Sequence, residues 1–282
     1  MEIGKKFYIV TISVFVILMA FLAIGDLDYT ISSAIINEDS LWARFFDIIG
    51  EFPAMLAIIV GVTLLYGGRR RDVTWWNVVS TILAVIFIGL FSYMAVFNPI
   101  RYIFHEDMDA ITSFAKVVNI ILSLAIAVAA LYIAHTKGEK FIEFKKHAWL
   151  LIVLVIGEMV LVNVVKILWA RPRMRSITDV SEFKHWYEIA GPTGDNELKS
   201  FPSGHTANAW IGLAYIIFSQ QIKMIKVNHF IIGAVIWGTL VALSRVVLGA
   251  HFLSDVLVGS YITIFLFILL ERIFIKHKVH KN

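Results

Sequence analysis

The sequence contains no cysteine among its 282 residues, which excludes disulfides, thiolate nucleophiles and thiolate metal sites. It also lacks a recognisable soluble domain, internal repeat or low-complexity linker. Its net charge of +4 is modest and gives no reason to expect nucleic-acid binding. Thiol chemistry and nucleic-acid recognition are therefore set aside.

Apolar residues dominate what is present. They make up 59% of the chain, and the mean hydropathy is +0.79, well above the range of ordinary globular domains. Because one membrane crossing takes roughly 20 apolar residues, the sequence predicts an all-α, polytopic membrane helix bundle of about eight transmembrane helices. The predicted spans are 7–25, 53–66, 75–97, 113–135, 148–168, 205–221, 230–249 and 255–272.

The distribution of charge predicts the orientation of these spans. Cytoplasmic loops of membrane proteins are enriched in lysine and arginine. Eight alternating spans place one basic set on a single side: Lys5, Lys6, Arg69, Arg70, Arg71, Lys137, Lys140, Lys145, Lys146, Lys223, Lys226, Lys276, Lys278 and Lys281. The opposite connections, 26–52 and 98–112, carry Asp26, Asp28, Asp39, Asp47, Glu106, Asp107 and Asp109. We therefore expect a multi-pass cell-membrane protein with both termini in the cytoplasm. Its first span is read as an uncleaved helix, because no clear small-x-small cleavage site precedes Asp26.

One stretch on the predicted outer side breaks this charge pattern. "KILWARPRMRSI" carries Lys166, Arg171, Arg173 and Arg175 on the side that should be poor in cations. A basic helix end whose side chains reach the interface is the simplest explanation. The alternative is an anion site, because the planar fork of arginine matches phosphate oxygens and lysine adds a point charge.

Two further polar clusters fall on the same side. Pro202-Ser203-Gly204-His205 stands where the sixth span begins, and a helix start offers free N–H groups and a positive dipole end to an anion. "SRVVLGAHFLSD" joins the last two spans and contains Arg245, His251 and Asp255. His251 and Asp255 are four residues apart, so a helical segment would let the carboxylate orient the imidazole. Each cluster alone fits an interfacial anchor or a plain hydrogen bond, whereas three on one face indicate a site.

These clusters resemble the signature of the type 2 phosphatidic acid phosphatase superfamily, which includes the vanadium haloperoxidases. Its three parts are K-x(6)-R-P, P-S-G-H and S-R-x(5)-H-x(3)-D. The second and third parts are complete here, and the first departs only at Met174, which stands where the family has proline. The resemblance covers about residues 150–272. It implies a phosphatase core at 148–282 and N-terminal membrane helices at 1–147, with about four spans, two more than the usual six-helix family core.

The resemblance also implies roles for individual residues. His251 would be the nucleophile that forms a phosphohistidine, Asp255 would orient it, and His205 would protonate the leaving oxygen. The phosphate oxygens would be held by Lys166, Arg173, Ser203, Gly204 and Arg245. No metal and no cofactor are implied, since these cations would serve instead. The roles of Arg171 and Arg175 stay open between substrate and lipid surface.

The expected substrate is a lipid phosphate or isoprenyl diphosphate, met at the outer membrane interface among membrane lipids. The resemblance allows phosphatidic acid, phosphatidylglycerol phosphate, undecaprenyl diphosphate, lipid A phosphates, sphingoid phosphates and glucose 6-phosphate. We favour an isoprenyl diphosphate or a glycerophospholipid phosphate. Aromatic residues of the 174–199 loop would anchor it at the interface or cover the lipid phosphate: Phe183, His185, Trp186 and Tyr187.

Two alternatives remain open at this point. A lipid phosphotransferase would pass the same phosphoryl group to a second lipid instead of water. A transporter with a polar path is the non-enzymatic alternative, for which Glu158 and Asn163 in the fifth span are the only hints.

Overall fold

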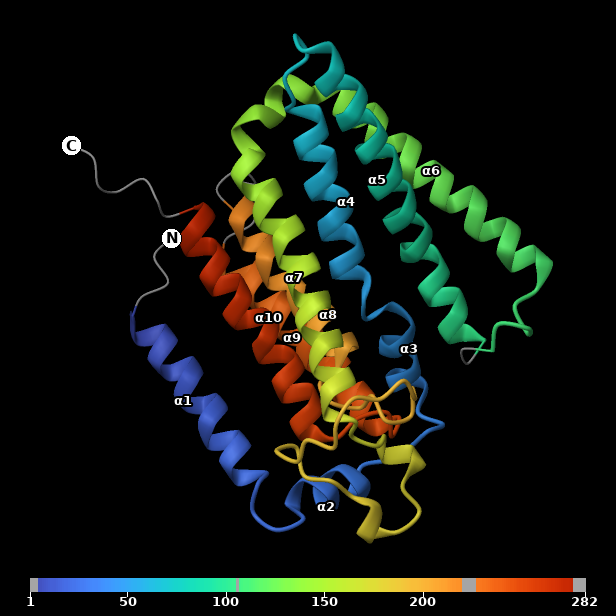
Figure 1. The fold of residues 1–282 in the computed structure, drawn as a ribbon, viewed down its shortest axis with the longest axis vertical. Coiled ribbons are helices and arrows are strands. Elements are labelled where there is room, and N and C mark those ends of the chain that lie inside the picture. Colours follow the sequence, from blue (N-terminus) through green and yellow to red (C-terminus); the bar gives the residue numbers. More distant parts are fainter. Residues whose placement is uncertain (1–4, 105–106, 220–226, 276–282) are drawn as a thin grey trace. The chain divides into compact units, whose positions relative to one another are not determined.

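The computed structural model describes residues 5–104, 107–219 and 227–275. Within these ranges the regular structure is helical and contains no strand (Figure 1). The α-helices are α1 Lys5–Phe21, α2 Leu27–Ala34, α3 Leu41–Ile49, α4 Phe52–Gly67, α5 Thr74–Ile103, α6 Ser113–Lys137, α7 Lys145–Trp169, α8 Gly204–Trp210, α9 Val227–Val247 and α10 Leu253–Phe274. Short 3₁₀ segments are η1 Gly138–Phe144, η2 Met174–Ser176, η3 Val180–Glu182 and η4 Ile211–Phe218. The predicted all-helical class is confirmed.

Five helical stretches in the described part of the chain are long and apolar enough to cross a membrane. They are Leu41–Gly67, Thr74–Ile103, Ser113–Ser176, Val227–Val247 and Leu253–Phe274. Each predicted span falls on helical structure. The sixth span falls on α8 and η4 over its described residues, 205–219. The count of about eight crossings stays a prediction, because α1 and the α8–η4 segment are shorter than a full crossing.

The segment 26–52 differs from the simple connection expected there. It contains two short helices, α2 and α3, rather than an open loop. Each buries an aspartate: Asp28 is 0% exposed and Asp47 is 3% exposed. Buried carboxylates are costly unless they are paired with cations or hydrogen-bond donors, so these two aspartates must have specific partners.

The chain divides into two compact units. The first comprises Met1–Asp47, Met159–Ala207 and Gly238–Thr263, and it contains every residue of the three motif parts. The second comprises Ile48–Glu158, Asn208–Trp237 and Ile264–Asn282. The predicted division into segments 1–147 and 148–282 stays a prediction.

The second unit is built on α4, α5 and α6, which pack against one another (Figure 1). Its two basic connections, the α4–α5 turn and η1, meet at one end. Arg71 donates to the carbonyl of His135 at 3.2 Å, and a Cβ at Gly138 would collide with the carbonyl of Gly67. These two connections, grouped by charge in the sequence, are therefore neighbours in space. The other predicted charges at Glu106, Lys223, Lys226, Lys276, Lys278 and Lys281 lie outside the described residues.

Candidate active site

His251 and Asp255 form the centre of the first unit's polar cluster. His251 lies in the turn between α9 and α10, and Asp255 lies in the first turn of α10. The His251 Nδ1 is 3.5 Å from the Asp255 carboxylate, and both side chains are buried. The backbone N–H of Phe252 donates to the same carboxylate oxygen at 2.9 Å. With Nδ1 facing the carboxylate, Nε2 lies on the opposite edge of the ring, where a nucleophile would react.

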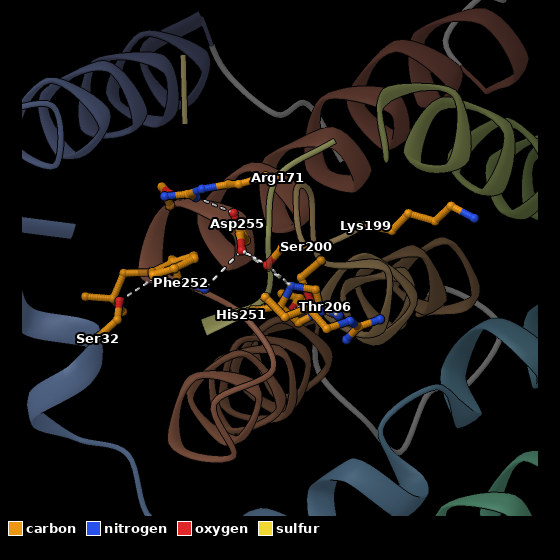
Figure 2. Close-up of polar contacts among 12 residues, drawn as sticks. Ser32, Arg171, Lys199, Ser200, Thr206, His251, Phe252 and Asp255 are labelled. Carbon is orange, nitrogen blue, oxygen red and sulfur yellow. Dashed lines mark hydrogen bonds and ion pairs between the residues drawn. The ribbon is translucent and has the colours of Figure 1, made fainter. Parts of the chain in front are cut away.

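Ser200 joins this pair and was not predicted from the sequence. Its hydroxyl donates to Asp255 at 2.5 Å and lies 3.5 Å from His251 Nδ1 (Figure 2). Ser200 is fully buried. A serine two residues before the family motif carried no signal of its own, because serine is common in such polar turns.

The start of α8 packs directly against α10. The N–H of Ser203 donates to the carbonyl of Asp255 at 3.0 Å, and a Cβ at Gly259 would collide with the carbonyl of Ser203. The Ser203 hydroxyl accepts from Thr206 at 3.0 Å. A Cβ at Gly204 would lie 3.7 Å from the Lys166 side chain. The motif glycine and the motif lysine are therefore neighbours.

Lys166 and Arg173 come from either side of the end of α7. Lys166 Nζ donates to the carbonyl of Lys199 at 2.7 Å, and Arg173 Nε donates to the carbonyl of Asn196 at 3.2 Å. Met174, which replaces the family proline, is buried at the start of η2. The substitution therefore places an apolar side chain inside the fold.

His205 and Arg245 meet at a carboxylate that the sequence analysis did not assign to the site. Arg245 and Asp47 form a buried ion pair. His205 Nε2 lies 3.6 Å from the Asp47 carboxylate and 3.2 Å from its backbone carbonyl. Arg44 adds a second cation at 3.2 Å. In the sequence, Asp47 is the single acid in the largely apolar stretch "LWARFFDII". That isolation was the one sign of a buried role, although its place in the 26–52 connection favoured an exposed loop residue.

The structure distinguishes Arg171 from Arg175, two arginines that the sequence leaves open between substrate binding and the lipid surface. Arg171 is 0% exposed and bonds to Asp28 and Asp255. Arg175 is partly exposed and pairs with Glu197 at 2.9 Å, a hydrogen bond that lowers the pKa of Glu197. Arg171 is thus part of the cluster's interior, and Arg175 belongs to the surface of the loop.

The aromatic loop is packed inward at Phe183. Its ring contacts those of Phe252 and Tyr29, with centroids 5.2 and 5.5 Å away, and lies 5.3 Å from the Arg171 guanidinium. Tyr187 is largely exposed and stacks on His185. Phe183 therefore contributes to packing around Arg171, whereas Tyr187 faces outward.

The charge environment of His251 favours the neutral imidazole. Burial lowers the pKa of His251 well below its ordinary value of 6.5. Asp255 opposes this shift, while the nearby Lys166 and Arg173 strengthen it. Among the described residues, no group of three or more histidine, aspartate and glutamate side chains has a geometry that could hold a metal ion.

These contacts bring all three motif parts together in the first unit, with Lys166 and Arg173 half-buried and the two histidines and Asp255 buried. Comparison with known proteins bears on the family of this site. The model of the PAP2 superfamily matches residues 147–278. This segment belongs to the PAP2 superfamily. It includes all eight predicted site residues, from Lys166 to Asp255, whereas Asp28 and Asp47 precede it. The family predicted from the motifs is confirmed.

A curated relative adds to the PAP2 match. The chain is 37% identical over 86 residues to phosphatidylglycerophosphatase B of Haemophilus influenzae (strain ATCC 51907 / DSM 11121 / KW20 / Rd). The aligned part is 27% of this chain and 35% of that protein, so the chain spans about a third of the length of this relative. No solved structure matches.

Proposed function

We propose that this protein is a membrane-embedded lipid phosphatase that acts through a phosphohistidine on His251. The observation that carries this proposal is the buried His251–Asp255 pair, surrounded by the other residues of the PAP2 motifs. A neutral imidazole oriented by a carboxylate is an activated nucleophile. The surrounding cations supply the charge that phosphoryl transfer needs in its transition state.

The proposed reaction has two steps. In the first, Nε2 of His251 attacks phosphorus, the bond from phosphorus to the lipid oxygen breaks, and His205 donates a proton to that oxygen. In the second, His205 takes a proton from water, the resulting hydroxide attacks phosphorus, and the bond to His251 breaks. Inorganic phosphate leaves, and both histidines return to their starting states. In this scheme the lysine and arginine side chains neutralise the phosphate charge that a metal ion would otherwise neutralise.

Substrate binding must rearrange one part of the site. Asp47 pairs with Arg245 and faces His205. A phosphate held by Arg245 would compete with this carboxylate for the guanidinium, because both are anions that bind the same fork. We therefore expect Arg245 to exchange part of its contact with Asp47 for the substrate.

We propose a glycerophospholipid phosphate as the substrate, with phosphatidylglycerol phosphate first. The similarity to phosphatidylglycerophosphatase B of Haemophilus influenzae supports this choice. An isoprenyl diphosphate is the alternative, since it presents the same terminal phosphate on an apolar chain. We place the protein in the cell membrane, with the site at the outer interface.

A phosphate-release screen tests the proposed function. The purified full chain is assayed in detergent micelles with phosphatidylglycerol phosphate, phosphatidic acid and an isoprenyl diphosphate, each with EDTA and with magnesium. We expect phosphate release from at least one lipid, undiminished by EDTA. Label appearing on a second lipid instead of in free phosphate would indicate a phosphotransferase. Absence of release and transfer from every lipid would contradict the proposal.

The predicted orientation can be checked with single cysteines, because the chain has none of its own. Gly194→Cys lies in the exposed loop near the site, with nothing within 4 Å of the new Cβ, and Arg70→Cys lies in the exposed α4–α5 turn. We expect an impermeant maleimide to label Gly194→Cys and spare Arg70→Cys in intact cells. Both should react in opened membranes. The reverse labelling pattern would place the site in the cytoplasm.

Loss of the Arg245 guanidinium should impair transition-state binding. Arg245→Ala is expected to lower turnover by about 10²–10³-fold, as removal of a charge-stabilising donor does in other enzymes. Arg70→Ala is the matched control, because Arg70 is exposed and pairs with Asp72. Near-normal turnover of Arg245→Ala on the best lipid substrate would exclude its role in holding phosphate.

The lowered pKa of His251 predicts how the site responds to acid. A histidine with a depressed pKa stays neutral at lower pH than usual and becomes protonated only below its folded pKa. In ligand-free protein, NMR titration should show the His251 ring still neutral at pH 6.5, with the signal assigned by its loss in His251→Gln. The rate should then fall in acid from protonation of His251 and in base from deprotonation of His205. Titration of His251 above pH 6.5 would contradict this account of its environment.

A further inference from the structure

Helix α2 covers the start of α10, the helix that carries Asp255. The N–H groups at a helix start have no partner within the helix. Here the Ser32 hydroxyl accepts from the N–H of Leu253 at 3.0 Å, and the Asp28 carboxylate accepts from the N–H of Ser254 at 3.0 Å. The Ser254 hydroxyl also donates to Asp28. Two side chains of α2 therefore fix the first residues of α10.

Arg171 connects this cap to the proposed nucleophile's partner. One guanidinium nitrogen, Nη2, lies 2.8 Å from Asp28, and Nη1 lies 2.5 Å from Asp255 and 2.7 Å from the Ser254 hydroxyl. Nε donates to the carbonyl of Lys184 at 2.8 Å. Arg171 is completely buried, with the ring of Phe252 4.2 Å away. Its planar fork is thus used in three directions at once.

The Asp255 carboxylate is consequently held on both oxygens (Figure 2). Arg171 donates to Oδ1, while Ser200 and the N–H of Phe252 donate to Oδ2, the oxygen nearest His251. A carboxylate bound this way cannot rotate without breaking at least two hydrogen bonds. The orientation of the His251 ring depends on that carboxylate. These contacts together therefore fix the orientation of the proposed nucleophile.

We propose that Arg171 and Asp28 are positioning residues for the phosphohistidine chemistry, acting through Asp255 on His251. The inference rests on the proposed function. Arg171 holds the Asp255 carboxylate in place, and Asp28 holds Arg171 while capping α10. Neither residue is a phosphate ligand, because Arg171 is enclosed by Asp28, Asp255 and the loop carbonyl. Asp28, which precedes the matched PAP2 segment, thereby supports the position of the proposed catalytic pair.

A purely structural role is the competing explanation, because breaking a buried ion pair also destabilises a fold. The two roles differ in what they change. A positioning role lowers the rate of phosphoryl transfer in folded protein, whereas a structural role lowers only the amount or melting temperature of folded protein. A phosphate-ligand role would weaken binding of substrate and of vanadate instead.

Two conservative substitutions separate these outcomes. Arg171→Lys keeps the charge but loses the three-way fork, and Asp28→Asn keeps an acceptor for Ser254 but loses the charge. In folded, purified full-length protein we expect kcat and the rate of phosphoenzyme formation to fall by about 10–100-fold, the scale of small misplacements of catalytic groups. KM and the vanadate inhibition constant should stay within about two-fold. Arg175→Lys is the matched control, since Arg175 belongs to the same loop but pairs at the surface with Glu197.

A double variant tests whether the effect passes through Asp255. Residues that act as a unit give strongly non-additive effects. Arg171→Lys should therefore lower kcat by less than about three-fold when it is added to Asp255→Asn. Normal kcat in both single variants, a loss confined to melting temperature, a shift in vanadate affinity, or full additivity would each overturn the inference. Absence of phosphate release and transfer by the wild-type protein would overturn the proposed function itself, so the two failures are distinguishable.

Discussion

Replacing His251 with alanine is expected to abolish the phosphoenzyme and to lower phosphate release by about 10³–10⁶-fold, the range found when a catalytic nucleophile is removed. The imidazole is the group whose Nδ1 is held by Asp255 and whose other nitrogen is left to react. No cysteine can replace it, because the chain has none. Acid-quenched turnover with labelled lipid phosphate and a phosphate-release assay measure the two effects separately.

Two further variants make the His251 result specific. His251→Gln keeps most of the side-chain volume and should be equally inactive, which separates lost chemistry from a cavity in the buried site. His135→Ala is the control, because His135 is exposed in the last turn of α6, in the second unit. It should retain near-normal turnover. Substantial phosphoenzyme in either His251 variant would show that another group carries the phosphate.

Replacing His205 with alanine is expected to slow hydrolysis in proportion to how poor the leaving group is. Proton donation to the leaving oxygen is typically worth about 10²–10⁴-fold. With a lipid alkyl phosphate, whose alkoxide needs that proton, the full loss should appear. With p-nitrophenyl phosphate, whose leaving group departs without protonation, most of the first-step rate should return. The phosphoenzyme should then accumulate, because the second step still lacks its base.

The paired substrates provide the check on His205. Rates of phosphoenzyme formation and decay are followed by rapid quench for both substrates in wild type and His205→Ala. Arg70→Ala serves as the background control, because its guanidinium is exposed and pairs with Asp72. An equal loss of the first-step rate with both leaving groups would mean that His205 supports phosphate binding or the fold rather than proton transfer.

Much of the helical framework could be predicted from the sequence, because its signal is local. A run of apolar residues long enough to cross a membrane predicts a helix without information from the rest of the chain. The predicted spans fall on α1, α4 to α10 and η4. The motif residues were equally accessible, since the spacing of Arg245, His251 and Asp255 is fixed along the chain. Their assignment to one site followed from the predicted topology, which puts all three polar clusters on one side of the membrane, and the family resemblance added a role for each residue.

The partners of those residues could not be predicted in this way. Asp47 is 198 positions from Arg245, and Asp28 is 143 positions from Arg171. A single sequence carries no signal for such pairings, and both aspartates looked like acids of an exposed connection. In the structure both aspartates are buried in short helices, where each carboxylate needs a cationic partner. The same burial distinguished Arg171 from Arg175, which the sequence presented as equivalent members of a basic cluster.

The most direct test is to find the phosphate on the protein during turnover. Wild-type protein is mixed with labelled phosphatidylglycerol phosphate, or with the best substrate from the lipid screen, and quenched within milliseconds under conditions that preserve phosphohistidine. Peptide mapping by mass spectrometry should place acid-labile phosphate on His251, with more label in His205→Ala and none in His251→Gln. Label on His205, or on no histidine at any quench time, would contradict the assignment of His251 as the nucleophile.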